Sequence, residues 1–170
     1  MKGLLEVEFR RLSDRKGPGA GRPAKLYRRS SQDVNVSLPH REYELAARVF
    51  AEALTAEGNP SPVKDAARSL GKEMASQVKE RAGRQQGTKR LTRTAEEVLQ
   101  GYGFEPFHDD GGNIRLRNCP FHQLSRRYTD LVCGMNLDIM QAMVEELGLE
   151  RLEPRLEPEP GMCCIAFKRT

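Results

Sequence analysis

All four cysteines of this 170-residue chain lie in its last third. Thirteen residues lie between Cys119 and Cys133, and twenty-nine lie between Cys133 and the adjacent pair Cys163 and Cys164. Spacing this wide requires three separate elements to bring the thiols to one point. Thiolates are soft ligands suited to zinc and to iron–sulfur clusters. Because the chain has no CxxC pair, the alternative that these are small buried hydrophobic residues is equally open.

His122 is a further candidate ligand, because a C-x-x-H pair such as Cys119 and His122 can chelate one ion. The alternative for this histidine is a surface position at a helix start. Successive residues of a strand point to opposite faces, so we expect only one of Cys163 and Cys164 to face a shared site. The candidate metal ligands are Cys119, Cys133, Cys163, Cys164 and His122.

The elements around the cysteines repeat one order. A helix ending at Gly103 precedes a hairpin over residues 104–117, and a second helix ending at Gly148 precedes a hairpin over residues 152–167. The steps from Gly103 to Gly148 and from Cys119 to Cys164 are both 45 positions. The pattern predicts two helix–hairpin units that share a four-stranded antiparallel sheet, an α+β domain over residues 94–170. Cys119 and Cys164 would then be equivalent, with Cys133 just before a turn at Gly134.

The N-terminal stretch carries concentrated positive charge. Residues 5–10 alternate apolar and polar side chains, residues 17–23 are rich in Gly and Pro, and residues 25–28 return as a strand, which predicts a hairpin with a long tip. Between Arg10 and Arg29 lie eight basic residues and one acid. Such a surface suits nucleic-acid phosphates, although a solvated basic loop is the alternative. The candidate DNA contacts are Arg10, Arg11, Arg15, Lys16, Arg22, Lys25 and Arg28.

Two amphipathic helices are expected between these ends, within residues 31–93. The first follows Pro39 and ends at Gly58, and the second begins at Ser61. Residues 82–93 are basic and rich in helix breakers, which predicts a flexible connector to the last domain.

Composition restricts the class of protein. Charged residues make up 31% of the chain, no apolar run approaches the ~20 residues that cross a bilayer, and charge interrupts the first residues too early for a signal peptide. We therefore expect a cytoplasmic protein with no membrane partner, whose cysteines are reduced thiols or metal ligands rather than disulfides. Gly17, Gly19 and Gly21 precede a strand rather than a helix, so they do not match a phosphate-binding loop. Cys133 and His122 lack a third residue that would orient them as a nucleophile and base, so an enzyme is not expected.

The segment GLLEVEFRRLSDRKGPGAGRPAKLYRRS, residues 3–30, resembles the wing hairpin of ArsR-type winged-helix transcriptional regulators. In that family a helix-turn-helix precedes the wing, so residues 1–30 are expected to be a wing without its recognition helix, binding DNA weakly and without sequence preference. The resemblance also implies that residues 31–93 join two protomers in a homodimer.

The segments NCPFHQLSRRYTDLVCGMN and GMCCIAF resemble the effector domain of the ArsR-like branch that includes the repressor of the iron–sulfur assembly (suf) operon. This resemblance implies an iron–sulfur cluster on Cys119, Cys133 and Cys163, with Cys164 as a substitute for Cys163. The implied function is a redox-sensing transcriptional regulator. A structural zinc site, a metal-free thiol switch and a small-ligand sensor domain are the alternatives.

Overall fold

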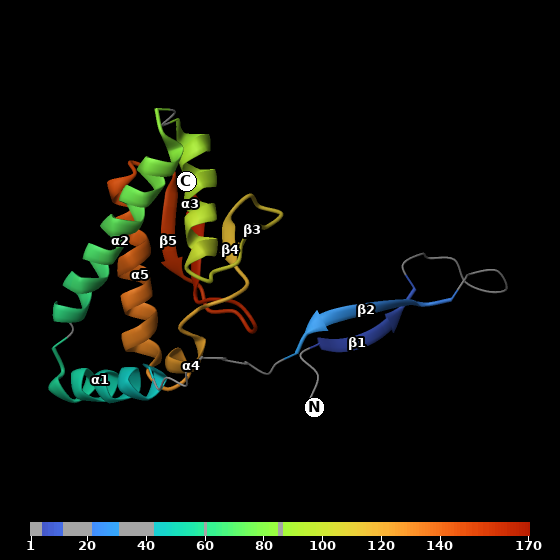
Figure 1. Cartoon of the computed structure of the whole chain (residues 1–170), viewed down its shortest axis with the longest axis horizontal. Helices are drawn as coiled ribbons and strands as arrows, with labels where there is room; N and C mark the ends of the chain where they lie inside the picture. Colours follow the sequence, from blue (N-terminus) through green and yellow to red (C-terminus); the bar gives the residue numbers. More distant parts are fainter. Residues whose placement is uncertain (1–4, 12–21, 31–42, 60, 85–86) are drawn as a thin grey trace. The chain divides into compact units, whose positions relative to one another are not determined.

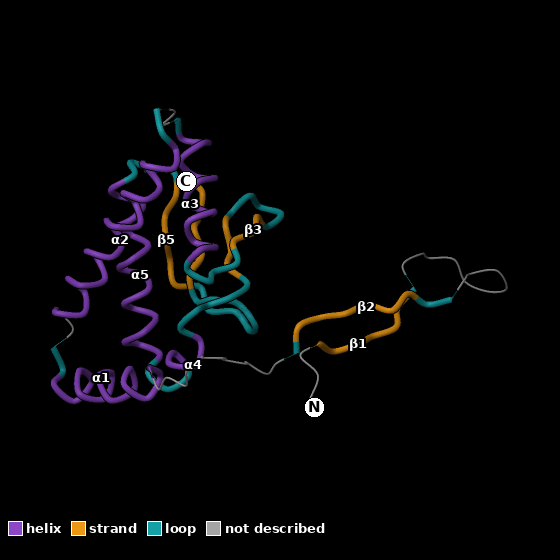
Figure 2. The backbone as a smooth tube through the Cα atoms, viewed as in Figure 1, coloured by secondary structure: helices purple, strands orange, loops and turns teal. Residues whose placement is uncertain are grey.

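The structure is a computed structural model that describes residues 5–11, 22–30, 43–59, 61–84 and 87–170. The chain divides into two compact units, unit 1 over Met1–Glu42 and unit 2 over Tyr43–Thr170. The described part of unit 1 is a two-stranded sheet, and unit 2 combines helices with a four-stranded sheet (Figures 1 and 2). The chain is therefore mixed α+β, as the sequence predicts.

Unit 1 contains the expected antiparallel hairpin, formed by β1 (Leu5–Arg10) and β2 (Ala24–Arg29). Val7 pairs with Tyr27 and Phe9 with Lys25, so one face carries apolar and basic side chains together. Phe9 is 62% exposed and Tyr27 is 59% exposed. A two-stranded hairpin in water has little stability of its own, so this apolar face needs a surface to pack on.

The two amphipathic helices of unit 2 are α1 (Tyr43–Glu57) and α2 (Ser61–Ala82). Gly58 ends the first at a φ of 68°, a left-handed conformation that favours glycine. The second helix begins at Ser61 as expected, and the side-chain Oδ1 of Asn59 accepts the backbone N–H of Ser61 at 3.1 Å. Pro39, expected just before the first helix, lies outside the described residues.

The core of unit 2 lies between the helices and one face of the sheet. α2 packs along α5 (Thr129–Glu146), and α3 (Thr88–Gly101) packs on α2. At the α2–α5 contact, a Cβ on Gly71 would lie 2.3 Å from the Ile139 carbonyl oxygen and 2.8 Å from the Ala142 Cβ. Only glycine at position 71 allows the two backbones to come this close.

The sheet has the strand order β3-β4-β6-β5, with every neighbour antiparallel. Its strands are β3 (Pro106–His108), β4 (Ile114–Leu116), β5 (Leu152–Leu156) and β6 (Ile165–Arg169). Ile114 pairs with Phe167 in the buried core. On the opposite face, Arg115 is paired with Glu157 at 3.1 Å and with Glu159.

The expected internal repeat is found at the helix ends and not at the cysteines. The N–H of Phe104 bonds the Leu99 carbonyl at 3.1 Å, and the N–H of Leu149 bonds the Val144 carbonyl at 3.1 Å, so both turns close in the same way 45 positions apart. Cys119, however, follows β4, whereas Cys164 precedes β6. The two cysteines are therefore not equivalent, because the second hairpin has the longer loop.

Two local expectations differ from the structure. The flexible connector expected over residues 82–93 is mostly helical: α2 reaches Ala82 and α3 begins at Thr88, because Leu91 and Thr94 are buried against the core. The turn expected at Gly134 is instead part of α5, which begins at Thr129. A single glycine inside a helix costs only about 1 kcal/mol, which the buried face of α5 offsets.

β5 is an edge strand of the four-stranded sheet, and Pro154 lies at its centre opposite Phe167. The N–H of Glu157 bonds the Cys164 carbonyl at 2.7 Å, and the N–H of Thr170 bonds the Arg151 carbonyl at 3.1 Å. Hydrogen-bonded and non-hydrogen-bonded residue pairs alternate along two antiparallel strands. The bonded pairs at Glu157 and Arg151 therefore make Pro154 and Phe167 a non-hydrogen-bonded pair. Its nitrogen therefore faces the free edge.

None of the described helices is long and apolar enough to span a bilayer.

Candidate functional site

The four cysteines come together because β4 and β6 are antiparallel neighbours. The end of β4 lies beside the start of β6, and the backbone N–H of Cys163 bonds the Leu116 carbonyl at 2.9 Å. Cys119 lies three residues beyond β4, whereas Cys163 and Cys164 lie just before β6. Cys133 comes from the second turn of α5. Three separate segments therefore supply the thiols, which we call the cysteine cluster.

The loop that carries Cys119 is anchored at several points. The side-chain amide of Asn118 donates to the Gly103 carbonyl at 2.6 Å, and the backbone N–H of His122 donates to the Cys119 carbonyl at 3.0 Å. The rings of Phe104 and Phe121 meet edge to face at 6.0 Å between centroids. These contacts hold the start of α4 (His122–Ser125) beside the core, so the loop holds Cys119 in a defined position.

The thiols shift one another's pKa values. The pKa of Cys163 is lowered, chiefly by hydrogen bonding from Cys119 and then from Cys164. The pKa of Cys119 is raised, first by the bond it donates to Cys163 and then by burial. The pKa of Cys164 is raised for the same two reasons and also by its hydrogen bond with Cys133. The cluster therefore favours one thiolate, on Cys163, with its neighbours protonated.

Asn136 lies beside that thiolate and was not anticipated from the sequence. Its side-chain Nδ2 donates to the Cys163 sulfur at 3.4 Å, and the residue is only 1% exposed. Its Oδ1 is buried and has no hydrogen-bond partner among the described residues. A buried oxygen without a hydrogen-bond partner costs free energy, so this asparagine destabilises the fold locally beside the cysteine cluster. The signal that could have identified it is its place three residues after Cys133, on the same helix face.

Both members of the cysteine pair join the cluster, contrary to the expectation that only one faces it. Successive side chains point to opposite faces only within a strand, and Cys163 and Cys164 lie in irregular backbone before β6 begins. His122 is exposed at the first position of α4, and none of the thiol hydrogen bonds involves its imidazole. Across the described residues, no group of three or more His, Cys, Asp and Glu side chains has its ligand atoms already arranged around a metal position.

No protein-family model, curated protein or solved structure matches this chain. The chemistry of the cluster must therefore be judged from the thiols and their neighbours alone.

The candidate DNA-contacting residues of the hairpin divide between its two faces. Arg10 and Arg28 share a face with Glu6 and Glu8, and Arg28 is paired with Glu6 at 2.5 Å. Lys25 lies on the other face, 5.1 Å above the Tyr27 ring. Arg11 and Arg22 are exposed at the strand ends. Arg15 and Lys16 lie outside the described residues. The described basic side chains of the hairpin are exposed, and those on its acidic face are partly neutralised.

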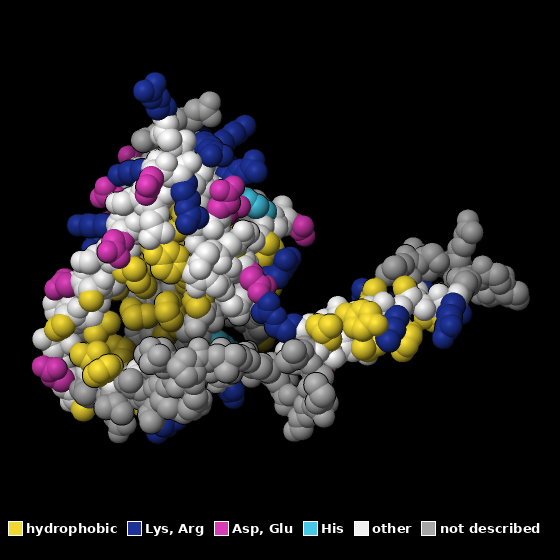
Figure 3. Space-filling view, in the orientation of Figure 1, with side chains coloured by type: hydrophobic (Ala, Val, Ile, Leu, Met, Phe, Trp, Pro, Cys, Tyr) yellow, Lys and Arg dark blue, Asp and Glu magenta, His cyan; other side chains and the backbone are white. Residues whose placement is uncertain are grey.

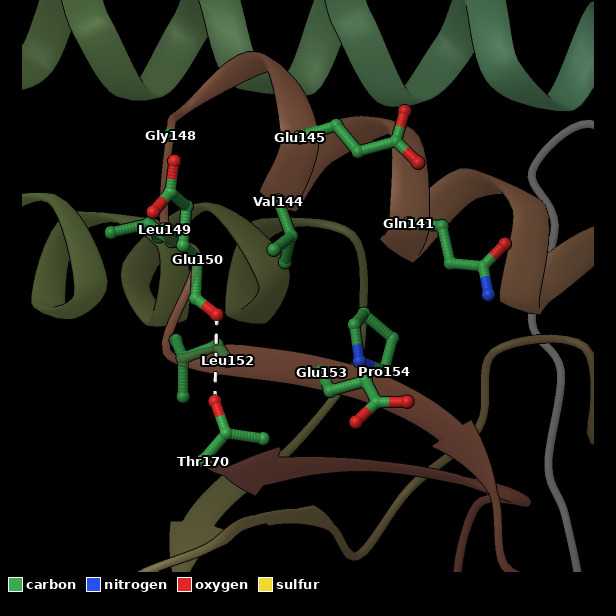
Figure 4. Close-up of a pocket in the computed structure, with 10 residues that line it drawn as sticks. All are labelled: Gln141, Val144, Glu145, Gly148, Leu149, Glu150, Leu152, Glu153, Pro154 and Thr170. Atoms are coloured by element: carbon green, nitrogen blue, oxygen red, sulfur yellow. Dashed lines mark hydrogen bonds between the residues drawn. The ribbon is translucent and has the colours of Figure 1, made fainter.

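Unit 2 also contains cavities that are separate from the thiols. One of about 590 Å³ lies between α5 and β5, with Val144, Leu149 and Leu152 on its inner wall (Figure 4). Three glutamates surround it, but Glu145 is paired with Arg68 and Glu153 with Arg155. An apolar groove of about 410 Å³ is lined by residues of α1, α2 and α5 together with Phe121, and Figure 3 shows hydrophobic side chains on this surface above α1.

Proposed function

We propose that this protein is the sensor and dimerisation part of a DNA-binding transcriptional regulator, and that its cysteine cluster holds an iron–sulfur cluster. The observation that supports this best is the meeting of four thiols from three segments at one end of the β4–β6 pair. An isolated core cysteine behaves as a small hydrophobic residue. Four cysteines gathered from three segments, one with a lowered pKa, instead offer the soft ligands that iron needs.

The residues around the thiols suit such a cofactor. Cys119, Cys133 and one or both of Cys163 and Cys164 would hold it, and the amide of Asn136 would donate to a ligand sulfur. Hydrogen bonds to sulfur and exclusion of solvent are the main ways in which a protein tunes an iron–sulfur centre. When bound, the group would supply an oxidation state and a stability that respond to oxygen and iron supply.

The protein's own part in signalling would run through α5. Cys133 lies near the start of this helix, and farther along the same helix the carbonyl of Ile139 packs against Gly71 of α2. Interfaces this tight shift as units rather than deforming gradually. A change in what the thiols hold would therefore bias the packing of α5 on α2, which is the two-state element that an allosteric regulator requires.

DNA binding and dimerisation complete the proposal. The exposed arginines of the β1–β2 hairpin would contact phosphates, giving weak and salt-dependent binding without sequence preference. A homodimer would use α1 and α2, an assignment supported by Phe50 of α1, which is 67% exposed. An aromatic side chain this exposed marks a surface suited to a partner.

A metal-free thiol switch is the second candidate, and the lowered pKa of Cys163 favours it. The Cys163 thiolate would be oxidised by hydrogen peroxide to a sulfenic acid with release of hydroxide, and the thiol of Cys119 or Cys164 would then displace water to form a disulfide. In total, two thiols and one peroxide give one disulfide and two waters. A structural zinc site with His122 as a ligand receives less support, because this exposed histidine would have to turn toward the thiols.

The test is an anaerobic preparation with iron, sulfide and zinc measured per chain and the visible spectrum recorded. We expect a brown protein with iron and acid-labile sulfide, and a Cys133→Ser variant that loses both while keeping its far-UV circular dichroism. A His122→Ala variant is the matched control and should keep its iron. A colourless wild-type protein that retains one zinc would refute the iron assignment. A metal-free protein that loses two thiols to one equivalent of peroxide would establish the switch instead.

A further inference from the structure

A cationic cavity of about 640 Å³ lies at the end of the sheet opposite the cysteine cluster. It is bounded by the start of α3, the β3–β4 turn and the far ends of β5 and β6. Figure 3 shows basic side chains gathered around the upper part of α3. We propose that this cavity binds a small organic anion, with a carboxylate or phosphate head on a short apolar body. The proposal is independent of what the thiols bind.

The charge around the cavity is predominantly positive. Lys89, Arg93, Arg151 and Arg169 line it, against the single acid Glu96. Glu96 is already engaged, since its carboxylate lies 3.1 Å from His108 Nε2. Arg93 is paired with Glu97 at 3.3 Å, but none of the other three cations has an ion pair with any residue the structure describes. Cations that converge on a cavity without partners favour an anionic ligand, and the guanidinium fork matches carboxylate and phosphate oxygens.

The start of α3 adds a second source of positive potential. Gly87 is its N-cap and offers no side-chain cap, and the first turn contains no acid. Within the part of the chain that the structure describes, the backbone N–H groups of that turn, which include those of Thr88 and Lys89, therefore have no side-chain cap of the kind most helices provide themselves. Lys89 in this turn also opposes the helix dipole. An anion in the cavity would satisfy the N–H groups and neutralise the lysine together.

Arg169 is held in position by the turn opposite. Gly112 has a φ of 75°, and a Cβ placed on it would lie 3.6 Å from Arg169 Nη1. The backbone N–H of Arg169 donates to Asn113 Oδ1 at 3.3 Å, and this asparagine is in turn bonded to Asp109. The guanidinium therefore lies against a defined turn, which lowers the entropic cost of using it to bind a ligand.

The floor of the cavity is apolar. Ile114 is 4% exposed, and Leu152 packs against the same core cluster. Beneath them lies an apolar gap of only about 10 Å³, lined in part by Leu99 and Phe167. A charged rim above an apolar floor suits a ligand with a charged head and a short apolar body. The cavity volume lies within the range of roughly 300–1,000 Å³ found for small-molecule sites.

The experiment titrates the ¹⁵N-labelled full chain with phenyl phosphate, benzoate, inorganic phosphate and neutral benzyl alcohol at constant ionic strength. We expect phenyl phosphate or benzoate to bind most tightly and to shift the backbone amides of residues 88–92 and Gly112. The variants Arg169→Gln and Arg151→Gln should each weaken that binding about tenfold or more, the loss of one charged hydrogen bond. Arg126→Gln removes another exposed arginine, beyond the opposite end of the sheet, and should leave the affinity unchanged.

Three outcomes would overturn the proposal. The first is that benzyl alcohol shifts the same amides with the affinity of benzoate, which would make the cavity a neutral apolar site. The second is that Arg126→Gln weakens binding as much as Arg169→Gln, which would reduce the effect to net charge. The third is that none of the small anions binds and only a duplex oligonucleotide shifts these amides. Both test arginines are exposed, so replacing them should leave the core intact. Unshifted resonances of the core residues in each variant would verify this.

Discussion

Gly71 offers the sharpest test of how unit 2 is packed. Replacing it with alanine places a Cβ 2.3 Å from the Ile139 carbonyl oxygen, whereas real Cβ contacts almost never fall below 3.0 Å. The α2 and α5 backbones must therefore separate by roughly 0.7 Å, and a gap of that size forfeits a quarter to a half of the dispersion energy of the contacts it opens. Overpacking of this kind costs up to about 3 kcal/mol.

Alanine also gains about 1 kcal/mol in helix propensity over glycine, so the net destabilisation expected for Gly71→Ala is about 2 kcal/mol. Urea unfolding followed by circular dichroism at 222 nm measures it, and with a slope of roughly 2 kcal/mol per molar the midpoint should fall by about 1 M. Gly134→Ala is the matched control, because it lies inside α5 and its Cβ would meet nothing within 4 Å. Its midpoint should rise.

The reasoning fails if Gly71→Ala is as stable as the wild-type protein. A midpoint that rises for both variants would mean that α2 and α5 are not held at the distance described. A fall for both would mean that helix propensity does not control position 134.

Further predictions concern the buried arginine and the thiolate. Replacing Glu157 and Glu159 together with alanine should cost about 2 kcal/mol in urea unfolding, because Arg115, whose side chain is only 11% exposed, loses both its partners; an unchanged midpoint would contradict this. In the folded protein the pKa of Cys163 lies below the ordinary thiol value of about 8.5. Ionisation of Cys163 therefore stabilises the fold fully above about pH 8.5. This stabilisation is lost as the pH falls through the lowered pKa of the folded state. The reduced, metal-free protein should therefore show thiolate absorbance at 240 nm at pH 7, absent from Cys163→Ser. Asn136→Leu, which removes the N–H donor, should move that titration to higher pH; an unmoved titration would show that the amide does not stabilise the thiolate.

Local chemistry explains which features could be predicted from the sequence. Alternation of apolar and polar side chains predicts β1, and the ends of α1, α3 and α5 follow from Gly58, Gly103 and Gly148, whose left-handed φ values glycine adopts readily. The connector predicted over residues 82–93 is helical from Thr88 onward, because charge and helix breakers are weak signals beside the burial of Leu91.

The geometry of the cysteine cluster could not be predicted in the same way. It depends on the pairing of β4 with β6, two strands about fifty positions apart, and local patterns carry no information about such a pairing. The 45-position step suggested instead that Cys119 and Cys164 were equivalent. Asn136 and the cationic cavity were missed for a related reason, since each is defined by neighbours from distant segments.

Pro154 has a consequence for how the protein behaves at high concentration. The outer edge of β5 is where another chain could add a strand, and such exposed edges are common starting points for aggregation. Because the proline nitrogen faces that edge and carries no hydrogen, an incoming strand would lose a bond at the centre of its register. Pro154→Val would restore the missing donor in a sequence that favours strands. The resulting protein should keep its fold and yet form fibrillar aggregates sooner than the parent chain on gentle heating.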